Sequence, residues 1–393
     1  MDQSPPTPVA IPGFTDHHAH LLREAAGVGF PATTAAVRAF HQRVAREGGT
    51  PMDVLDPPLT ESGLAGRLVA GLARAAASGL VEITEMGMRS WAYLDALDAA
   101  QETGPLPVRV RIYLASGLAE ESSLPELDQR RANCGPWLRL EGIKFYADGW
   151  LGPRTCAMCQ DFADTGERGL LFTDAPRLAR RIRPLAERGW RIATHAIGDR
   201  GTQTVLDAYD LAWDGDRTAI ATAAPRIEHA SVLSPELIAR MSASGVVAGI
   251  QPSFAVTDAN VLGPALGPER AAMMAYPWNA LAAAGVTMLA GTDYPIEVLE
   301  PLVGLARLTA GRSKRPGFGT ADGAPGQAVL PVAKAFDLMT DPAAGQTQLT
   351  ADPRTAALDE IDRIEVVGTE PIPFWPDVRQ RAGRGATSAS PFR

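Results

Sequence analysis

The feature that most constrains this chain is the repeated alternation of short apolar runs with longer amphipathic segments. Eight runs fit buried strands, at residues 9–16, 80–86, 108–116, 140–148, 191–198, 226–231, 246–253 and 287–294. Continuous apolar runs of this length are typical of parallel strands that are covered on both faces. Eight strand-then-helix repeats therefore predict an α/β fold whose sheet closes into a (β/α)₈ TIM barrel.

The pattern changes beyond about residue 312. Residues 331–340 predict a short helix, residues 361–372 predict a lone strand, and the tail over 379–393 has the composition of a disordered segment. We therefore expect a barrel domain over residues 1–345 and a C-terminal extension over residues 346–393.

Composition and charge narrow the classes of partner. The chain has 37 basic and 45 acidic residues, a net charge of −8, and no basic run, so nucleic acid is not an expected partner. Its apolar stretches are shorter than the roughly 18 residues of a membrane helix. The N-terminus lacks the features of a signal peptide, and three cysteines are too few for a disulfide framework. We expect a cytoplasmic protein that has neither nucleic acid nor a membrane as its partner.

Side chains that bind metals fall at or near the C-terminal ends of the predicted strands. His18 and His20 are two residues apart and therefore share one face of the first strand. Other predicted strands carry Lys144, His195, His229 and Asp293 in the same region. Barrel active sites lie at this end, and imidazole and carboxylate groups suit Zn²⁺ and similar ions, so the pattern indicates a metal site. The two remaining histidines, His17 and His41, fit ordinary surface positions.

These motifs make the chain similar to the amidohydrolase superfamily, and within it to family 3, which includes N-substituted formamide deformylases. The resemblance rests on GFTDHHAHL, GIKFYADGWLGPRT, THAIGDRG, RIEHASVLSPELIARMSASGVVAGIQPSF and LAAAGVTMLAGTDYPIE, which run in family order from residue 11 to about 310. The family fold is a (β/α)₈ barrel beside a small β-sandwich. Few residues here flank the barrel, so the sandwich is expected to be vestigial or absent. The barrel surface that this exposes suggests a homo-oligomer.

The resemblance also implies a metal centre with two divalent ions, expected to be Zn²⁺. It assigns His18, His20 and Asp293 to the more buried ion, and His195 and His229 to the more exposed one. The position of Lys144 matches a lysine that carries a bridging carbamate in many relatives. A carbamate is an anionic ligand, whereas an ammonium beside two cations is disfavoured. One ion beside an unmodified lysine is the alternative.

The activity implied by the resemblance is hydrolysis of a C–N bond, in an amide or an N-formyl group of a small-molecule substrate, by metal-activated hydroxide. Asp293 would act as general base and then as general acid. A metal-dependent decarboxylase or isomerase of the same superfamily is one alternative, and a non-catalytic binding barrel is another. The presence of all the ligand positions favours the hydrolase.

Four residues are candidates for substrate binding: Trp150, Arg154, Arg200 and Tyr294. Trp150 stands where relatives commonly have serine, and it could line a pocket for an aromatic group or pack beneath a loop. Each of the two arginines could bind a substrate oxygen or brace a loop through an ion pair. Asp258, in the segment after the seventh predicted strand, could contact substrate or remain solvated.

Overall fold

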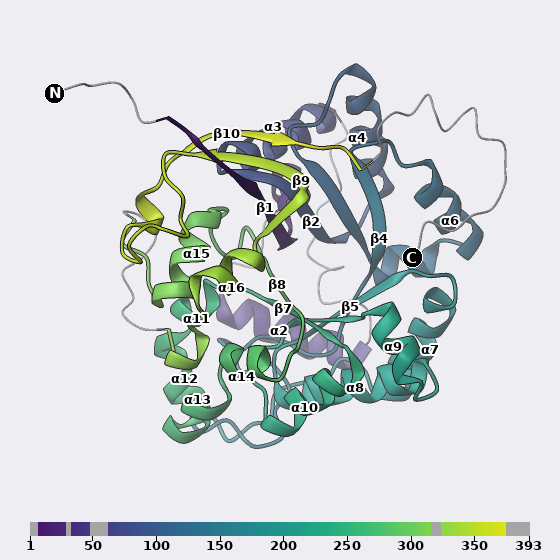
Figure 1. The fold of residues 1–393 in the computed structure, drawn as a ribbon. Coiled ribbons are helices and arrows are strands. Elements are labelled where there is room, and N and C mark those ends of the chain that lie inside the picture. The colour runs from purple at the N-terminus through teal and green to yellow at the C-terminus, as the bar shows by residue number, and fades with distance from the viewer. Residues whose placement is uncertain (1–6, 29–32, 48–61, 316–323, 375–393) are drawn as a thin grey trace.

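The parallel sheet contains all eight strands that the sequence predicts. The computed structural model describes residues 7–28, 33–47, 62–315 and 324–374 (Figure 1). Its sheet has the order β10-β9-β1-β2-β3-β4-β5-β6-β7-β8. The parallel strands are β1 (Val9–Ala19), β2 (Leu80–Met88), β3 (Arg109–Ala115), β4 (Leu138–Tyr146), β5 (Arg191–Ala196), β6 (Arg226–His229), β7 (Val247–Ile250) and β8 (Met288–Ala290).

The first and eighth strands meet and close the barrel. Ala19 and Tyr294 form a parallel bridge. The amide of Asp293 donates to the carbonyl of His18 (2.6 Å), and the amide of His20 donates to the carbonyl of Tyr294 (2.7 Å). The predicted (β/α)₈ barrel is confirmed.

Helices cover the outside of the sheet, and their apolar faces pack against the outward-facing strand residues. Side chains such as Ile83, Ile112 and Ile227 are fully buried in this layer. The sequence signals of helix ends are met at α10, where the Ser234 hydroxyl accepts from the amide of Leu237 and Gly245 ends the helix with a φ of 67°. The covering helices are α3 (Leu64–Ala77), α4 (Trp91–Thr103), α5 (Ser116–Glu121), α6 (Leu124–Asn133), α7 (Ala175–Ala186), α8 (Asp199–Ala212), α9 (Arg217–Ala223), α10 (Pro235–Ser244), α14 (Trp278–Ala283) and α15 (Pro301–Ala310).

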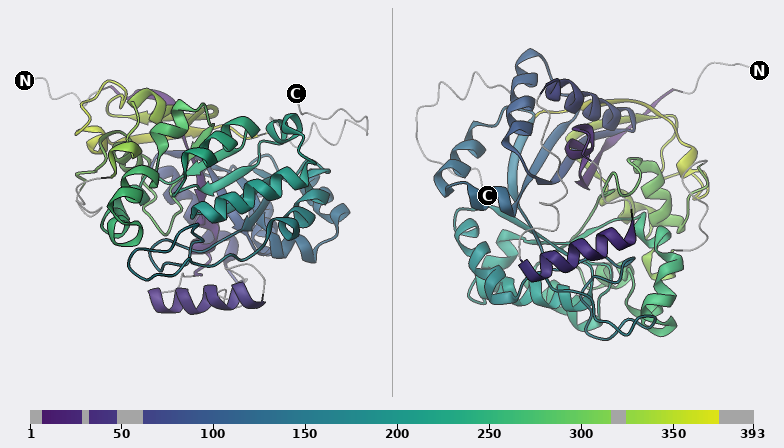
Figure 2. Two further views of the ribbon diagram at one scale, coloured as in Figure 1. Left: turned by 90° about the horizontal axis from the view of Figure 1, so that it is seen from below. Right: turned by 180° about the vertical axis from the view of Figure 1, so that it is seen from behind.

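Further helices lie in the long connections at the C-terminal end of the barrel. They are α1 (Leu21–Ala25), α2 (Thr34–Glu47), α11 (Phe254–Thr257), α12 (Ala259–Leu266) and α13 (Pro268–Met274). In the left view of Figure 2, helix α2 lies below the rest of the molecule. It lies beside the loop after β4, because His41 contacts Thr155 of that loop through a 2.8 Å hydrogen bond. Among the described residues, no helix has the length and apolar character needed to cross a membrane.

The C-terminal region adds two antiparallel strands to the barrel sheet. The predicted short helix is confirmed as α16 (Val332–Asp337), and short 3₁₀ turns lie at Gly326–Ala328 and Ile361–Arg363. The predicted lone strand is β10 (Val366–Pro371), but it pairs with β9 (Thr340–Leu349), which the sequence reading missed. Strand β9 in turn pairs with the N-terminal half of β1, where Val9 lies opposite Leu349.

The expected division of the chain after residue 345 stays a prediction. Strand β9 runs across that position without a break. The expected disordered tail, residues 379–393, lies outside the described residues.

Candidate metal centre

The C-terminal ends of the barrel strands surround one pocket with a volume of about 220 Å³. Every residue that the sequence assigned to the metal centre lines this pocket: His18, His20, Lys144, His195, His229 and Asp293. These residues come from strands that lie far apart in the sequence, so the closed barrel brings them together.

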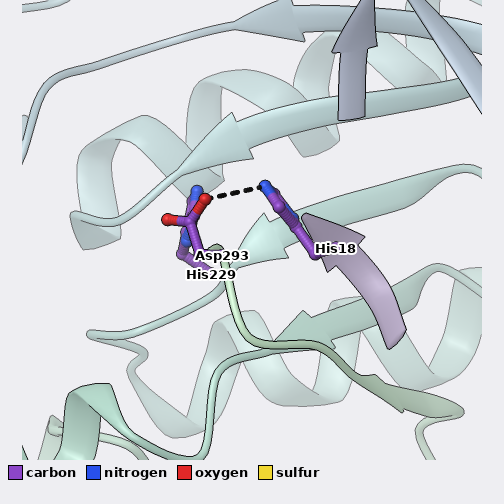
Figure 3. A group of neighbouring side chains, drawn as sticks. All are labelled: His18, His229 and Asp293. Carbon is purple, nitrogen blue, oxygen red and sulfur yellow. Dashed lines mark ion pairs between the residues drawn. The ribbon is translucent and has the colours of Figure 1, made fainter. Parts of the chain in front are cut away.

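Three of these side chains form a compact group that could hold a metal ion (Figure 3). One ligand atom from each of His18, His229 and Asp293 lies within 4.8 Å of the others. The Nε2 atom of His18 is 3.4 Å from Asp293 Oδ1, and His20 Nε2 is 3.1 Å from the same oxygen. The ring centroids of His195 and His229 are 4.4 Å apart, so His195 borders the group.

Two of the three have an unusual backbone conformation. His229 has a φ of 76° and Asp293 a φ of 58°, which is the left-handed region that residues other than glycine seldom adopt. Such a conformation costs on the order of 1 kcal/mol or more and persists when surrounding contacts fix it. Asp16 supplies some of these contacts, because its carboxylate accepts from the amides of His18 and Thr292 (both 3.0 Å) and from the Thr292 hydroxyl (2.6 Å). It therefore ties β1 to the segment that carries Asp293.

Hydrogen bonds to the protein fix the orientation of three imidazole rings. In each, one ring nitrogen faces an acceptor and therefore carries the proton, so the other nitrogen offers a lone pair. The bonds are His18 Nδ1 to Glu228 Oε2 (2.6 Å), His229 Nδ1 to Gln251 Oε1 (2.8 Å) and His195 Nε2 to the carbonyl of Gly149 (3.0 Å). The sequence reading missed Glu228 and Gln251. A signal for Glu228 was present, since it is a charged residue inside the apolar strand next to His229.

Burial keeps these histidines neutral. Removal from water lowers the pKa of His18 and of His229 well below the usual range, and it lowers the pKa of His195 to about 3. The pKa of His20 is also lowered, again mainly by burial. The neutral imidazole is the form that binds a metal ion.

Lys144 is one of the buried polar residues with an atom that makes no hydrogen bond within the described part of the chain, and it lines the pocket. It is 1% exposed, and among the described residues its Nζ has no hydrogen-bond partner. Burial lowers the pKa of its amine to about 8. The buried Nε2 of His18 likewise makes no hydrogen bond within the described part of the chain. Buried polar atoms without partners are rare in native proteins, so this donor set fits a bound cation.

The four candidate substrate-binding residues lie in different surroundings. Trp150 lines the pocket, and its ring makes an edge contact with His41. Arg154 pairs with Asp164 (2.7 Å) and donates to two carbonyls of its own loop. Arg200 is exposed and Tyr294 half-buried, and neither is among the residues that line the pocket. Their roles in substrate binding stay predictions.

The expectation that His17 and His41 are surface residues is wrong for His41. Its side chain is 1% exposed and packs between Trp150 and Phe172. His17 is half-buried, and its Nε2 lies 3.0 Å from the Thr15 hydroxyl. The burial of His41 could not be read from the sequence, because Trp150 and Phe172, which contact it, lie more than 100 positions away.

The fold and the grouped side chains define a parallel barrel with a metal-type site at the carboxyl ends of its strands. Residues 32–352 match the amidohydrolase family, and the chain belongs to this family. The matched range begins after His18 and His20, which lie on β1 and directly behind it.

Comparison with curated proteins gives relatives much longer than this chain. This chain is 29% identical to YtcJ of Bacillus subtilis (strain 168) in an alignment that covers 64% of this chain. It is 32% identical to the protein LONG AFTER FAR-RED 3 of Arabidopsis thaliana in an alignment that covers 44% of this chain. The chain spans 45% and 30% of these two proteins, which is less than half of each.

A solved structure supports the fold. The crystal structure of an uncharacterized metal-dependent hydrolase from Pyrococcus horikoshii OT3 aligns with a TM-score of 0.68 at 18% identity. The alignment covers 89% of this chain and 88% of that one, so the two share an architecture across nearly their whole lengths.

Proposed function

We propose that this protein is a metal-dependent hydrolase that cleaves an amide or N-formyl C–N bond in a small molecule. The observation that carries the proposal is the convergence, on one buried pocket, of neutral imidazoles, a carboxylate and two buried polar atoms without hydrogen bonds. Membership of the amidohydrolase family supports the same reaction class.

The side chains divide into two sets of ligands. His18, His20 and Asp293 would hold one divalent ion, because both imidazoles lie within 3.4 Å of the same carboxylate oxygen. His195 and His229 would hold a second. The predominance of imidazole over other donors favours Zn²⁺.

Lys144 would join the two sets as a carbamate. Formation of a carbamate requires the uncharged amine, and an amine with a pKa of about 8 is neutral far more often near pH 7 than an ordinary lysine. The carbamate would also give the Nζ position a negative charge and two oxygen ligands, which removes the cost of an unpaired buried amine. The alternative is one ion beside an unmodified Lys144.

The chemistry follows from what the residues do around a bound substrate. Divalent ions, when bound, polarise a carbonyl oxygen and lower the pKa of water. Asp293 accepts a proton from the attacking water and returns it to the leaving nitrogen. The hydroxyl of the water remains on the carbonyl carbon, the C–N bond breaks, and the products are a carboxylic acid (formate, for an N-formyl group) and an amine. Glu228 and Gln251 hold the imidazoles in place during this cycle.

A direct test combines metal analysis with turnover. We expect about two zinc ions per chain by elemental mass spectrometry, hydrolysis of members of a panel of N-formyl and N-acyl amines, loss of activity on chelation and recovery on zinc addition. A ¹³C carbamate signal after exposure to labelled CO₂, absent in Lys144→Ala, would support the bridge. A purified protein that is free of metal and indifferent to chelators would contradict the proposal.

We also propose that β9 and β10 are the reduced counterpart of the accessory β-sandwich of family relatives. Strand β9 pairs antiparallel with the N-terminal half of β1, and β10 pairs antiparallel with β9, which supports this view because it places both strands outside the parallel barrel. The homo-oligomer and the cytoplasmic location stay predictions.

A further inference from the structure

The pocket has an acidic group on the segments that follow β7 and β8. Asp258, Tyr276 and Glu297 all line the cavity, and none of them belongs to the candidate metal centre. Asp258 follows α11, and its amide donates to the carbonyl of Phe254 (2.8 Å), one helical turn earlier. The Phe254 ring stacks on the His229 imidazole with centroids 5.9 Å apart. Asp258 is therefore about one helical turn, roughly 5 Å along the helix axis, beyond the residue that contacts the metal centre.

The carboxylate of Asp258 has spare capacity to accept hydrogen bonds. Tyr276 donates its hydroxyl to Oδ2, and within the described residues no donor reaches Oδ1. A carboxylate can accept about four hydrogen bonds, so a single donor leaves most of this capacity free. The nearby guanidinium of Arg154 is engaged with Asp164 and with the carbonyls of Leu151 and Gly152.

Glu297 adds negative charge to the same region. Its Oε1 accepts from the Thr257 hydroxyl (2.7 Å), and its Oε2 lies 3.4 Å from Arg307. Burial is the main cause that raises the pKa of Glu297, and repulsion by Asp258 and Asp293 contributes. The carboxylates of Asp258 and Glu297 therefore have less positive charge near them than negative charge on the side that faces the cavity.

The remaining lining limits what else the pocket can bind. Among the described residues it contains no arginine, and its one lysine is Lys144 in the metal centre. Among the described residues, the cation near Asp258 is Arg154, and its guanidinium is already paired with Asp164, so a carboxylate on the substrate would find little positive charge at this end. Aromatic rings of Trp150, Phe254 and Tyr276 border the rest of the cavity. Its volume of about 220 Å³ lies below the roughly 300–1,000 Å³ of pockets for drug-sized ligands, so the substrate is small.

From these contacts we infer that the substrate is a small N-acylated amine with a second, cationic or hydrogen-bond-donating group, bound by Asp258 with support from Glu297. The inference rests on the proposed hydrolase function for the bond that is cleaved. The apolar middle of the molecule lies among the aromatic side chains, and a carboxylate at the same end is rejected by repulsion. Asp258 and Glu297 are the residues that determine this specificity.

The test compares three N-benzylformamides that differ only at the para position, which carries an aminomethyl, a methyl or a carboxylate group. For the zinc-loaded protein, we expect kcat/KM to be about 10- to 100-fold higher for the aminomethyl than for the methyl compound, because a charge-assisted hydrogen bond is gained. The carboxylate compound should be the poorest substrate. Asp258→Asn should reduce the preference to within about threefold, and Glu297→Gln should reduce it in part. Asp207→Asn, at a half-buried acid on α8 that pairs with Arg240 outside the pocket, is the matched control and should keep the preference.

Failure of the inference can be told apart from failure of the proposed reaction. If none of the three formamides is hydrolysed, the proposed cleavage of an N-formyl bond fails, and calorimetric binding of the same compounds tests recognition alone. Tighter binding of the aminomethyl compound that is lost in Asp258→Asn would still support the inference. Equal turnover or equal binding of the three compounds would overturn it, as would a preference that survives in Asp258→Asn. Should that variant not fold, the response of the preference to Glu297→Gln decides in the same way.

Discussion

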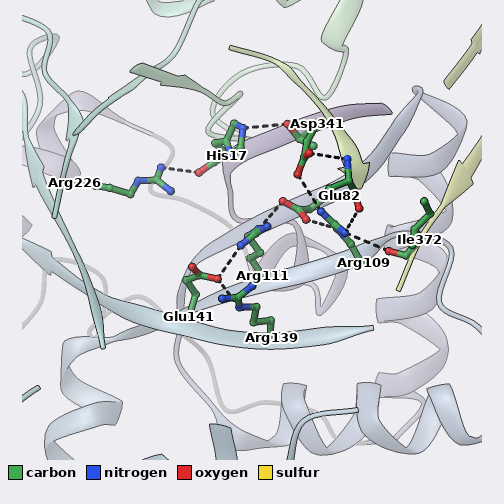
Figure 4. A network of polar contacts seen from close by, with 11 residues as sticks. His17, Glu82, Arg109, Arg111, Arg139, Glu141, Arg226, Asp341 and Ile372 are labelled. Atoms are coloured by element: carbon green, nitrogen blue, oxygen red, sulfur yellow. Dashed lines mark hydrogen bonds and ion pairs between the residues drawn. The ribbon is translucent and has the colours of Figure 1, made fainter. Parts of the chain in front are cut away.

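The two ends of the barrel both contain buried charged and polar side chains, but they satisfy them in different ways. At the N-terminal end of β2, β3 and β4, charged residues pair with one another (Figure 4). Glu82, 1% exposed, accepts from both Arg109 and Arg111, and Arg111 also pairs with Glu141 (2.9 Å). Although burial opposes ionisation, Arg111 and Arg139 lower the pKa of Glu141. Arg109 further donates to the carbonyl of Ala343 on β9 (2.7 Å), so this network also holds the C-terminal strands.

At the C-terminal end, the polar groups remain partly unsatisfied within the described chain. Lys144 Nζ and His18 Nε2 make no hydrogen bond among the described residues. Burial outweighs the nearby carboxylates, so the pKa values of His20 and His229 are lowered. Arg226 and Glu228 connect the two ends, since Glu228 contacts both Arg226 (2.6 Å) and His18 (2.6 Å). The N-terminal network is complete within the described chain, whereas the C-terminal group would be completed by the proposed metal ions. The difference separates a structural network from a functional site without reference to any relative.

Removal of Lys144 should give the largest effect on activity. Lys144→Ala takes away the proposed bridge between the ions, and we expect hydrolysis to fall by more than about 1,000-fold, with loss of bound metal. Lys334→Ala, at an exposed lysine on α16, is the matched control and should leave both unchanged. The measurements are turnover and metal content per chain. Normal turnover and metal content in Lys144→Ala would show that the unpaired amine marks no site.

A change in the N-terminal network should lower the free energy of unfolding rather than the activity. Glu82→Ala leaves Arg109 and Arg111 without their shared carboxylate, and removing one partner of a buried ion pair costs about 3–5 kcal/mol of unfolding free energy. Glu120→Ala breaks an exposed pair with Arg181 and should cost less than about 1 kcal/mol. Denaturant unfolding measures both.

The same measurement on Lys144→Met sharpens the contrast between the two ends. In the chelated protein this change removes an unpaired buried amine, so it should be neutral or stabilising. A comparable loss of stability from Glu82→Ala and from Lys144→Met would break the distinction between them.

A change at Glu228, which connects the two ends of the barrel, should have an intermediate effect on metal affinity and turnover. Glu228→Gln keeps the shape of the side chain but weakens its bond to His18, and we expect metal affinity and turnover to fall about 10- to 100-fold. Competition with a chromophoric chelator measures the affinity. Glu236→Gln, an exposed acid in the first turn of α10, serves as the control. A lower melting temperature with unchanged metal affinity would make Glu228 part of the structural network alone.

The parts of this architecture that the sequence predicts are those governed by local patterns. Runs of apolar residues located all eight barrel strands, and strand periodicity placed His18 and His20 together. Strand β9 was not predicted, because its sequence TDPAAGQTQL contains a proline and a glycine and lacks a strong alternation of apolar and polar residues. It forms because β1 and β10 offer it partners on both sides, which is a tertiary effect.

The supporting contacts of the site could not be read in the same way. Glu228 and Gln251 matter through the histidines that they contact on other strands, His18 and His229, which lie 210 and 22 positions away in the sequence. His41 was expected at the surface, yet α2 carries it into a buried site against the loop after β4. Contacts that depend on the course of a long connection can be identified only once the three-dimensional structure is known.

A change at His41 should have the smallest effect on stability. His41 adds a third case to the comparison, because it is a buried, hydrogen-bonded histidine that lies outside both the N-terminal network and the metal centre. Burial lowers its pKa from 6.5 to about 4. Between these values the unfolded chain binds a proton that the folded chain does not, so stability is fully present above pH 6.5 and is lost as the pH falls toward 4. The slope is at most about 1.4 kcal/mol per pH unit. His41→Gln can keep a bond to Thr155 but cannot titrate, so the difference in unfolding free energy between wild type and variant should change between pH 7.5 and 4.5. Urea titrations across that range measure it, and parallel curves would mean that His41 titrates alike in the folded and unfolded chain.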